Sequence, residues 1–484
     1  MKSVKSGSKP KVRFTQSKDL PWLSILVYVC VVFIWVITAA PGNMSPDSLE
    51  SFRQIFQGAY SDFHPIIYTL FVGFTSLWGN FPTGVILIQS ILVSLTIFML
   101  MKRLLPEVNV KIVLYLCSIA YSTPFVGNFA TTIWKDVPYS CFTLMGFLLF
   151  FDRSLDLAKS KFSQGKRSTF GLFMIGLGSA FRHEGVVTAL VISLIFLVLS
   201  YRTREVRLSF KSFIRPAALI VFVLLLSVLA QNLLVAITNA EPAPKDNSVS
   251  SFLHDLAYTR GMSTQKLPKN ADLIINSIIS GESATAAKNC SNGSLMFEKA
   301  GFSSTALNEN ASSIPKIWVR VLFSENGTTL LKARFCKSQT FIPFPFATPP
   351  SSYVWGYFGI DPNPFGFDNQ IHKGIFSPIL IELRNFTVAW LNLWNSIGRV
   401  IAWPGLHSGF IIFTLIFFRK KLKIDPELVL ILGSVVLGRT FVLVGAANGP
   451  WYRLALPIYF ISITLVLLIS YLIIKQIRIE FNKL

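Results

Sequence analysis

The sequence predicts an all-α polytopic membrane protein with about ten transmembrane helices. The chain has 484 residues, of which 52% are hydrophobic and only 14% are charged. Its apolar stretches are continuous rather than alternating and reach the length that crosses a bilayer, so helices are expected and not a β-barrel. A soluble globular class is therefore excluded.

Lysine and arginine residues lie in short clusters between the apolar stretches. The clusters run from Lys2 to Lys18, Lys102 to Lys111, Arg153 to Arg167, Arg202 to Arg215, Arg419 to Lys423 and Lys475 to Lys483. The net charge of +21 thus follows the positive-inside rule and does not indicate a nucleic-acid surface. All six clusters, and with them both termini, are expected in the cytoplasm.

The first apolar stretch, 21–40, is long enough to span the bilayer. No small-residue cleavage site follows a short apolar core, so this stretch is expected to stay as an anchor. It follows a basic cytoplasmic tail, 1–20, and leads into an external loop, 41–65.

The chain must then cross the membrane an odd number of times to reach the basic cluster at Lys102. The segment Ile66 to Trp78 is too short to span comfortably, whereas Thr83 to Met101 has about the right length. An interfacial helix is therefore expected within 66–79, followed by one spanning helix.

The same reasoning makes Phe386 to Val400 a juxtamembrane helix, because the better spanning candidate Ile401 to Phe418 follows it. The other expected spans are Lys111 to Val126, Val137 to Phe151, Phe170 to Phe181, Val186 to Ser200, Pro216 to Thr238, Glu427 to Ala446 and Leu454 to Ile474.

These spans divide the chain into a transmembrane core, 21–238, and C-terminal transmembrane helices, 401–474, with a cytoplasmic tail, 475–484. Between them, 239–400 holds the one long stretch without a spanning run, ending in the juxtamembrane helix. It is expected to be a soluble insertion outside the cytoplasm. Cys290 and Cys336 are its only cysteines, and an oxidising exterior allows them to form a disulfide or to remain as two thiols.

Polar residues beside the spans collect at four places, all on the expected external side. The first is the loop with Asp47, Glu50, Asp62 and His64, in which Ser45-Pro46 is a good start for a short helix. On the loop alone, a helix-terminal carboxylate and a solvated histidine are the more common explanation.

The other three places are the Lys135-Asp136 pair, the run Arg182-His183-Glu184 and Arg453. Ordinary helix-start pairs, turns and interfacial anchors account for each one separately. Together they form an external site whose cations suit phosphate oxygens and whose carboxylates suit a hydroxyl nucleophile.

These residues stand in motifs that resemble the C-type (GT-C) glycosyltransferases. The first external loop of that family has an acidic motif followed by a Pro-containing segment of the His-Pro-Pro-Leu-Tyr kind, with Ile66 here in place of the second proline. The similar segments are Pro46-Asp-Ser-Leu-Glu50, His64-Pro-Ile-Ile-Tyr68, Trp134-Lys-Asp-Val-Pro138, Arg182-His-Glu-Gly185, Trp318-Val-Arg-Val-Leu with Arg334, and Tyr452-Arg-Leu-Ala-Leu-Pro457. The resemblance is to uncharacterised bacterial members related to protein O-mannosyltransferases and aminoarabinose transferases.

The resemblance implies a protein of the plasma or inner membrane that transfers a sugar from a polyprenyl-phosphate donor, with inversion at the anomeric carbon. The acceptor would be a glycan, lipid or protein of the cell envelope, on the external side of that membrane. Asp47 would be the general base. Lys135, Arg182 and Arg453 would bind the phosphate, beside Asp136, His183 and Glu184, while Glu50, Asp62 and His64 would shape the acceptor pocket. A divalent cation held by Asp47 and Asp62 is a further option, although no protein-only metal spacing is present.

Two other functions fit the sequence. A transporter or flippase of envelope precursors would be expected to show two related halves and interrupted helices at the midplane. A polymerase of lipid-linked glycans would use the same kind of substrate. Neither nucleic acid nor a nucleotide-binding loop is expected.

Overall fold

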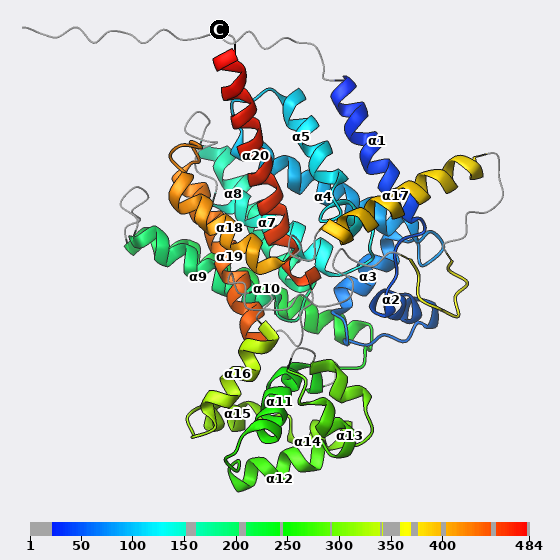
Figure 1. The fold of residues 1–484 in the computed structure, drawn as a ribbon, viewed down its shortest axis with the longest axis vertical. Coiled ribbons are helices and arrows are strands. Elements are labelled where there is room, and N and C mark those ends of the chain that lie inside the picture. The colour runs from blue at the N-terminus through cyan, green and yellow to red at the C-terminus, as the bar shows by residue number, and fades with distance from the viewer. Residues whose placement is uncertain are drawn as a thin grey trace, which may run out of the picture.

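The computed structural model describes residues 22–151, 161–202, 210–242, 245–290, 293–338, 341, 359–368, 376–397, 403–446 and 452–481 (Figure 1). Within these ranges the chain is helical, with isolated β-bridges and no β-strand. The predicted all-α class is thus confirmed for the described residues. The predicted tail 1–20 lies outside them.

The first part of the chain forms ten helices within the described ranges. They are α1 (Trp22–Ala39), α2 (Pro46–Gln57), α3 (Ile66–Thr75), α4 (Thr83–Leu104), α5 (Val110–Ser122), α6 (Gly127–Ala130), α7 (Asp136–Phe150), α8 (Lys161–Ala180), α9 (Gly185–Arg202) and α10 (Phe210–Ile237). The last part forms α17 (Ser377–Ile397), α18 (Pro404–Phe413) with a π turn (Thr414–Phe418), α19 (Pro426–Ala446), the 3-10 turn η5 (Tyr452–Ala455) and α20 (Leu456–Phe481).

Five stretches of the described chain are helical, long and apolar enough to cross a membrane. They are Trp22–Ala39, Thr83–Leu104, Ala217–Ile237, Pro426–Gly445 and Arg453–Phe481, at the positions of five predicted spans. On α10, large apolar side chains such as Phe222, Leu225 and Leu229 are exposed rather than packed. A hydrocarbon environment is the one in which such a surface is stable.

The remaining predicted spans are mostly shorter apolar helices. α7 has 15 residues and α5 has 13, and α5 ends at Ser122 instead of Val126 because Pro124 disfavours helical backbone in the residue before it. The predicted segment Phe170 to Phe181 forms the second half of α8. The predicted juxtamembrane helix is longer than expected, since α17 already begins at Ser377.

Helix α3 covers the segment predicted to lie in the interface. It has 10 residues, about 15 Å at 1.5 Å per residue, which is half of a bilayer core. Leu77 and Trp78 follow it with positive φ angles of 51° and 57°, so the chain turns sharply before α4. The helix therefore does not continue from Ile66 to Trp78.

The insertion folds as a lobe with its own hydrophobic core. It contains α11 (Lys245–Met262), α12 (Lys269–Ile278), α13 (Gly281–Ala286), the 3-10 helix η2 (Gly293–Glu298), α14 (Ser304–Asn310), α15 (Ile314–Leu322) and α16 (Gly327–Ser338). Buried side chains such as Leu253, Ile275 and Val321 form this core, which is separate from that of the bundle. In Figure 1 the lobe lies beyond the end of the bundle that carries α2.

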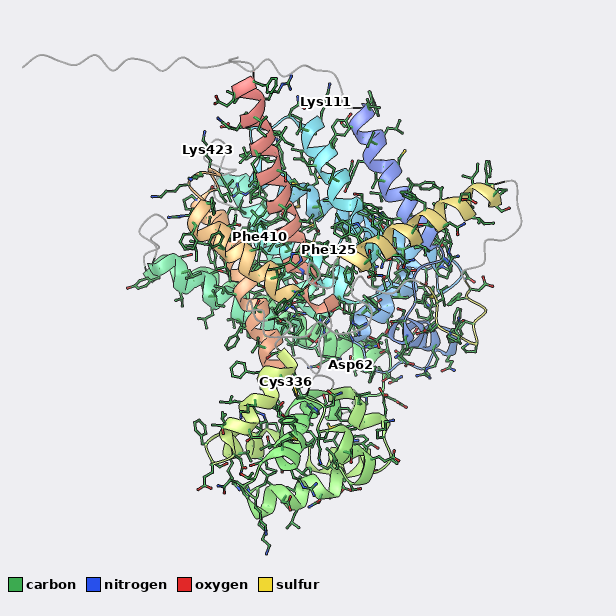
Figure 2. The ribbon with its side chains drawn as sticks, viewed as in Figure 1. Asp62, Lys111, Phe125, Cys336, Phe410 and Lys423 are labelled. Carbon is green, nitrogen blue, oxygen red and sulfur yellow. A yellow bond between two sulfur atoms is a disulfide. The ribbon has the colours of Figure 1, made fainter. Side chains whose placement is uncertain are left out.

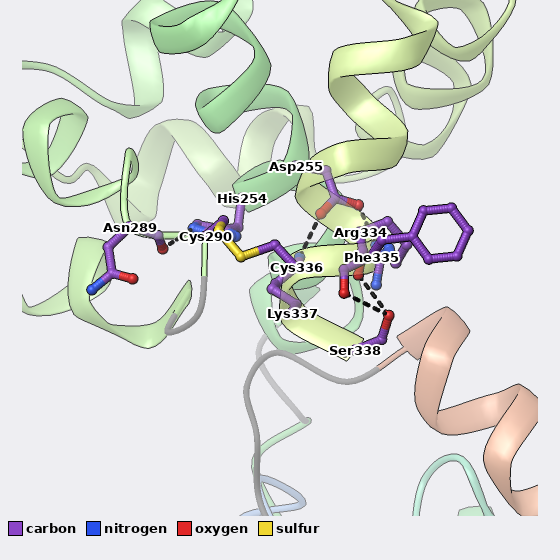
Figure 3. The surroundings of a disulfide bond; sticks show 9 residues. All are labelled: His254, Asp255, Asn289, Cys290, Arg334, Phe335, Cys336, Lys337 and Ser338. Atoms are coloured by element: carbon purple, nitrogen blue, oxygen red, sulfur yellow. Dashed lines mark hydrogen bonds and ion pairs between the residues drawn. A yellow bond between two sulfur atoms is a disulfide. The ribbon is translucent and has the colours of Figure 1, made fainter. Parts of the chain in front are cut away.

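A disulfide and a buried cluster of charged side chains link segments of the lobe that are far apart in the sequence (Figure 3). Cys290 and Cys336 are bonded, which is one of the two states that the sequence left open. Beside them the buried Asp255 carboxylate accepts from Arg334 and lies 2.6 Å from the Nζ atom of Lys337. The Trp318 indole also donates to Asp255, at 2.9 Å, so this carboxylate joins α11 to α15 and α16.

The described segment 359–368 is bonded to the loop before α2. The Met44 amide donates to the Gly359 carbonyl at 2.8 Å, and the Asp361 amide donates to the Met44 carbonyl at 3.1 Å. Phe365 and Phe367 then pack against aromatic side chains of α2. Chain that follows the lobe in sequence therefore holds the start of α2.

Candidate functional site

Helix α2 begins where the sequence predicts and places Asp47 in its first turn. Pro46 occupies the first helical position and needs no intrahelical donor. The Ser45 amide donates to the Ser48 hydroxyl at 3.2 Å, which satisfies one amide at the helix start. The partial positive charge at this end favours an ionised Asp47.

The loop before α2 is bonded to the loop before α7. The Asn43 amide donates to the Thr131 carbonyl, and the Ile133 amide donates to the Asn43 carbonyl, each at 3.0 Å. The Ser48 hydroxyl donates to the Ile133 carbonyl at 2.6 Å. These bonds hold Asp47 beside the start of α7, where Lys135 and Asp136 lie.

Close packing of α7 on α8 brings Asp136 to Arg182. A Cβ atom at Gly171 of α8 would lie 2.6 Å from the backbone nitrogen of Phe150, so only glycine permits this approach. The start of α7 then meets the turn that follows α8. There the Arg182 guanidinium contacts Asp136 and donates to Glu184 at 2.6 Å.

Charged side chains from five segments form a chain of ion pairs. Its members, in order of contact, are Asp47, Arg453, Asp136, Arg182, Glu184 and Arg439. An Arg453 Nη2 atom lies 2.6 Å from Asp47 Oδ2, and the Arg453 Nε atom lies 3.8 Å from Asp136 Oδ2. The Arg453 guanidinium also covers the Trp134 ring, 4.8 Å from its centre.

His64 and Lys135 extend this cluster on the other side of Asp47. The Lys135 Nζ atom lies 2.6 Å from His64 Nδ1, and His64 Nε2 lies 3.9 Å from Asp47 Oδ1. His64 is only 3% exposed, and its Nε2 atom has no hydrogen-bond partner among the described residues. A buried nitrogen without a hydrogen-bond partner costs folding free energy, so its presence calls for a functional explanation.

A small cavity opens at the centre of the cluster. Its volume is about 180 Å³, counting its open mouth. The lining residues are Asp47, His64, Tyr68, Ile133, Trp134, Lys135, Asp136 and Arg453. One carboxylate that is partly exposed and two cations therefore meet at the same opening.

The surroundings shift the ionisation of the lining groups. Burial alone would raise the pKa of Asp47, but the positive charges of Arg453 and Lys135 outweigh it and hold the pKa well below its ordinary value. Burial and the nearby Arg182 lower the pKa of Lys135 to about 7. Burial and the charge of Lys135 lower the pKa of His64 to about 3, so the imidazole is neutral at pH 7.

Five predicted site residues do not line the cavity: Arg182 and Glu184, which belong to the ion-pair chain, and Glu50, Asp62 and His183, which have other partners. Glu50 accepts from Arg53, one turn away on α2, at 2.6 Å and 2.7 Å. Asp62 accepts from the Ile66 amide at the start of α3, and His183 contacts the Asp62 carbonyl oxygen at 3.0 Å. Among the residues that the structure describes, no three His, Cys, Asp or Glu side chains gather as a metal site, and Asp47 and Asp62 hold different partners.

Arg439 is the member of the cluster that sequence reasoning missed. It lies in α19, is 1% exposed, and donates from Nε to the Leu454 carbonyl at 2.9 Å. Gly438 beside it packs tightly against Ile192 of α9, which brings Arg439 within 3.9 Å of Glu184. An arginine inside an apolar stretch of spanning length is itself a sequence signal of a functional or paired residue.

Acidification is expected to destabilise the protein through His64. The folded pKa of about 3 lies below the ordinary value of 6.5, so the unfolded chain binds more protons between these limits. The contribution of neutral His64 to the free energy of unfolding is fully present above pH 6.5 and is lost as the pH falls. The loss is on the order of 1–2 kcal/mol between pH 7 and pH 5. Apparent melting temperatures in detergent should fall over this range, and fall less in His64→Gln. Equal slopes in the two proteins would contradict the assignment.

The chain matches no protein-family model, no curated protein and no solved structure. The resemblance to GT-C enzymes thus depends on the sequence motifs alone. The function must be argued from the residues of the site.

Proposed function

We propose that this protein is a membrane glycosyltransferase that moves a sugar from a polyprenyl-phosphate-linked donor to an acceptor outside the cytoplasm. The observation that carries the proposal is the cavity where Asp47 meets Lys135 and Arg453. Two cations at one opening suit a phosphate anion, and a carboxylate between them suits a hydroxyl group.

In this reaction Lys135 and Arg453 hold the donor phosphate, and Asp47 accepts the proton of the acceptor hydroxyl. The acceptor oxygen forms a bond to the anomeric carbon while the bond from that carbon to the phosphate oxygen breaks. Polyprenyl phosphate leaves, and attack from the opposite face inverts the configuration. The two cations offset the charge that grows on the leaving phosphate.

The charge of the whole cluster supports an anionic ligand. Four cations, Lys135, Arg182, Arg439 and Arg453, stand against the three carboxylates of the ion-pair chain. The cluster therefore carries one excess positive charge when Lys135 is protonated. No step of the proposal passes through a metal ion, although a divalent cation beside the phosphate fits the same chemistry.

The proposed topology has ten crossings, both termini in the cytoplasm, and the site and the lobe outside a plasma or inner membrane. Figure 2 supports this orientation, with Lys111 and Lys423 toward one end of the bundle and Asp62 toward the other. A reporter fused within 77–81 should report an external position, whereas a cytoplasmic signal would overturn the parity. A fusion in the lobe at 263–268 should behave in the same way.

A polymerase of lipid-linked glycans would use the same cations and the same base, and is distinguished only by its acceptor. A transporter or flippase would move its substrate without breaking a bond. A carboxylate that lines the same cavity as two cations favours group transfer, since transport alone has no need for a general base.

The lipid that accompanies the purified protein tests the proposed donor class. Mass spectrometry of extracted lipid should detect a polyprenyl-phosphate sugar or polyprenyl phosphate with the wild-type protein. The amount should fall strongly in Arg453→Met, which lacks one of the two cavity cations. Bulk phospholipid alone in both proteins would count against the proposal.

A further inference from the structure

Both cations that line the cavity are already engaged. The Lys135 Nζ atom contacts His64 Nδ1, and the Arg453 guanidinium contacts Asp47, each at 2.6 Å. Arg182 and Arg439 do not line the cavity and are held by Asp136 and Glu184. An anion that enters therefore meets cations that already have partners.

Asp47 is the carboxylate best placed to give way. Its side chain is 37% exposed and lies at the cavity, in the first turn of a 12-residue helix. The Asp136 side chain is only 2% exposed and is fixed by Arg182. A phosphate that binds Arg453 from the cavity side must compete first with the Asp47 carboxylate.

A second partner for Asp47 is in place. His64 Nε2 is buried, lacks a hydrogen-bond partner among the residues that the structure describes, and lies 3.9 Å from Asp47 Oδ1. When Lys135 is an ammonium ion it donates to Nδ1, so Nε2 carries the imidazole proton and is a donor. A shift of about 1 Å would bring the carboxylate within hydrogen-bond distance of this nitrogen.

We infer that Asp47 exchanges partners during the reaction, holding Arg453 in the resting site and moving to His64 when the donor phosphate takes Arg453. The inference rests on the proposed function and adds a regulation to it. Paired with a cation, Asp47 is a weak base; beside a neutral imidazole it is a stronger one. The base therefore becomes effective only after the donor is bound, which makes donor binding precede activation of the acceptor.

The test is binding of farnesyl phosphate, a short prenyl phosphate, to the purified full-length protein in detergent, measured by calorimetry. Asp47→Asn removes the competing carboxylate and should bind the probe more tightly than the wild type, by roughly tenfold. Asp272→Asn is the matched control, because it breaks a carboxylate–arginine pair with Arg260 on the lobe. Its affinity should equal that of the wild type.

A double-mutant cycle isolates the exchange from other effects of the substitution. In an Arg453→Met background the Asp47→Asn change should bring no gain in affinity, because the shared cation is gone. Unchanged or weaker binding by Asp47→Asn, in protein that melts like the wild type, would overturn the exchange. So would an equal gain in both backgrounds.

The same measurements separate this inference from the proposed function. Tighter binding by Asp47→Asn without sugar transfer by the wild type would leave the exchange standing and remove the glycosyltransferase assignment. Sugar transfer by the wild type with no gain in Asp47→Asn would remove the exchange alone.

Discussion

Asp47→Asn is expected to abolish sugar transfer, with a fall in kcat of about 10³-fold. The asparagine amide has nearly the same shape but cannot accept the proton of an acceptor hydroxyl. The loss should appear in kcat and not as weaker donor binding, because Asp47 competes with the phosphate for Arg453 in the resting site. Initial rates over a range of donor concentrations separate the two effects.

Glu50→Gln tests whether Asp47 alone acts as the general base or whether any carboxylate of this loop can do so. Glu50 lies one turn along α2 and is held by Arg53 on the outer surface. Its removal should cost less than about 1 kcal/mol of stability and leave most of the transfer rate. Comparable losses in the two variants, or full activity in Asp47→Asn, would remove Asp47 from the role of base.

Asp255→Asn is expected to destabilise the lobe by about 3–5 kcal/mol. The Asp255 carboxylate is fully buried and is the partner of two cations, Arg334 and Lys337, which are also buried. A neutral amide leaves both charges without compensation in a medium of low polarity. Thermal unfolding in detergent, with limited proteolysis of the lobe as a second readout, measures the effect.

Asp272→Asn is the control for this prediction. Its partner Arg260 lies in the same lobe, but the pair is partly exposed to solvent, and surface pairs of this kind contribute about 0–1 kcal/mol. Similar shifts in the two variants would show that the buried cluster does not hold the lobe together. Low yield of Asp255→Asn with normal Asp272→Asn would agree with the account.

The helical fold could be predicted from the sequence because apolar runs of spanning length determine helices in a bilayer. The parity of the basic clusters also predicted a short helix near Ile66, and α3 has 10 residues. The helices of the lobe could not be located in this way. Its core is assembled from short segments far apart in the chain, such as those with Leu253 and Val321.

In the structure, ion pairs and the contact between Lys135 and His64 join seven residues to Asp47: His64, Lys135, Asp136, Arg182, Glu184, Arg439 and Arg453. The sequence predicted all of them except Arg439. It could not predict which carboxylates face the cavity, since that depends on the contact between the loops at Asn43 and Thr131. The spacing of Glu50 and Arg53 did offer a warning, because residues three apart pair on a helix surface. Arg439 could not be grouped with these residues from the sequence, because it lies inside an apolar helix and not beside the end of a predicted span.

Sugar transfer by the purified protein tests the central proposal most directly. Wild-type protein would be incubated with polyprenyl-phosphate-linked sugars, radiolabelled in the sugar, and with a cell-envelope extract as acceptor. We expect the label to appear in the acceptor together with an equal amount of free polyprenyl phosphate, and neither product with Asp47→Asn. Donor that stays chemically intact while the wild-type protein carries it across a vesicle membrane would contradict the proposal and identify a transporter.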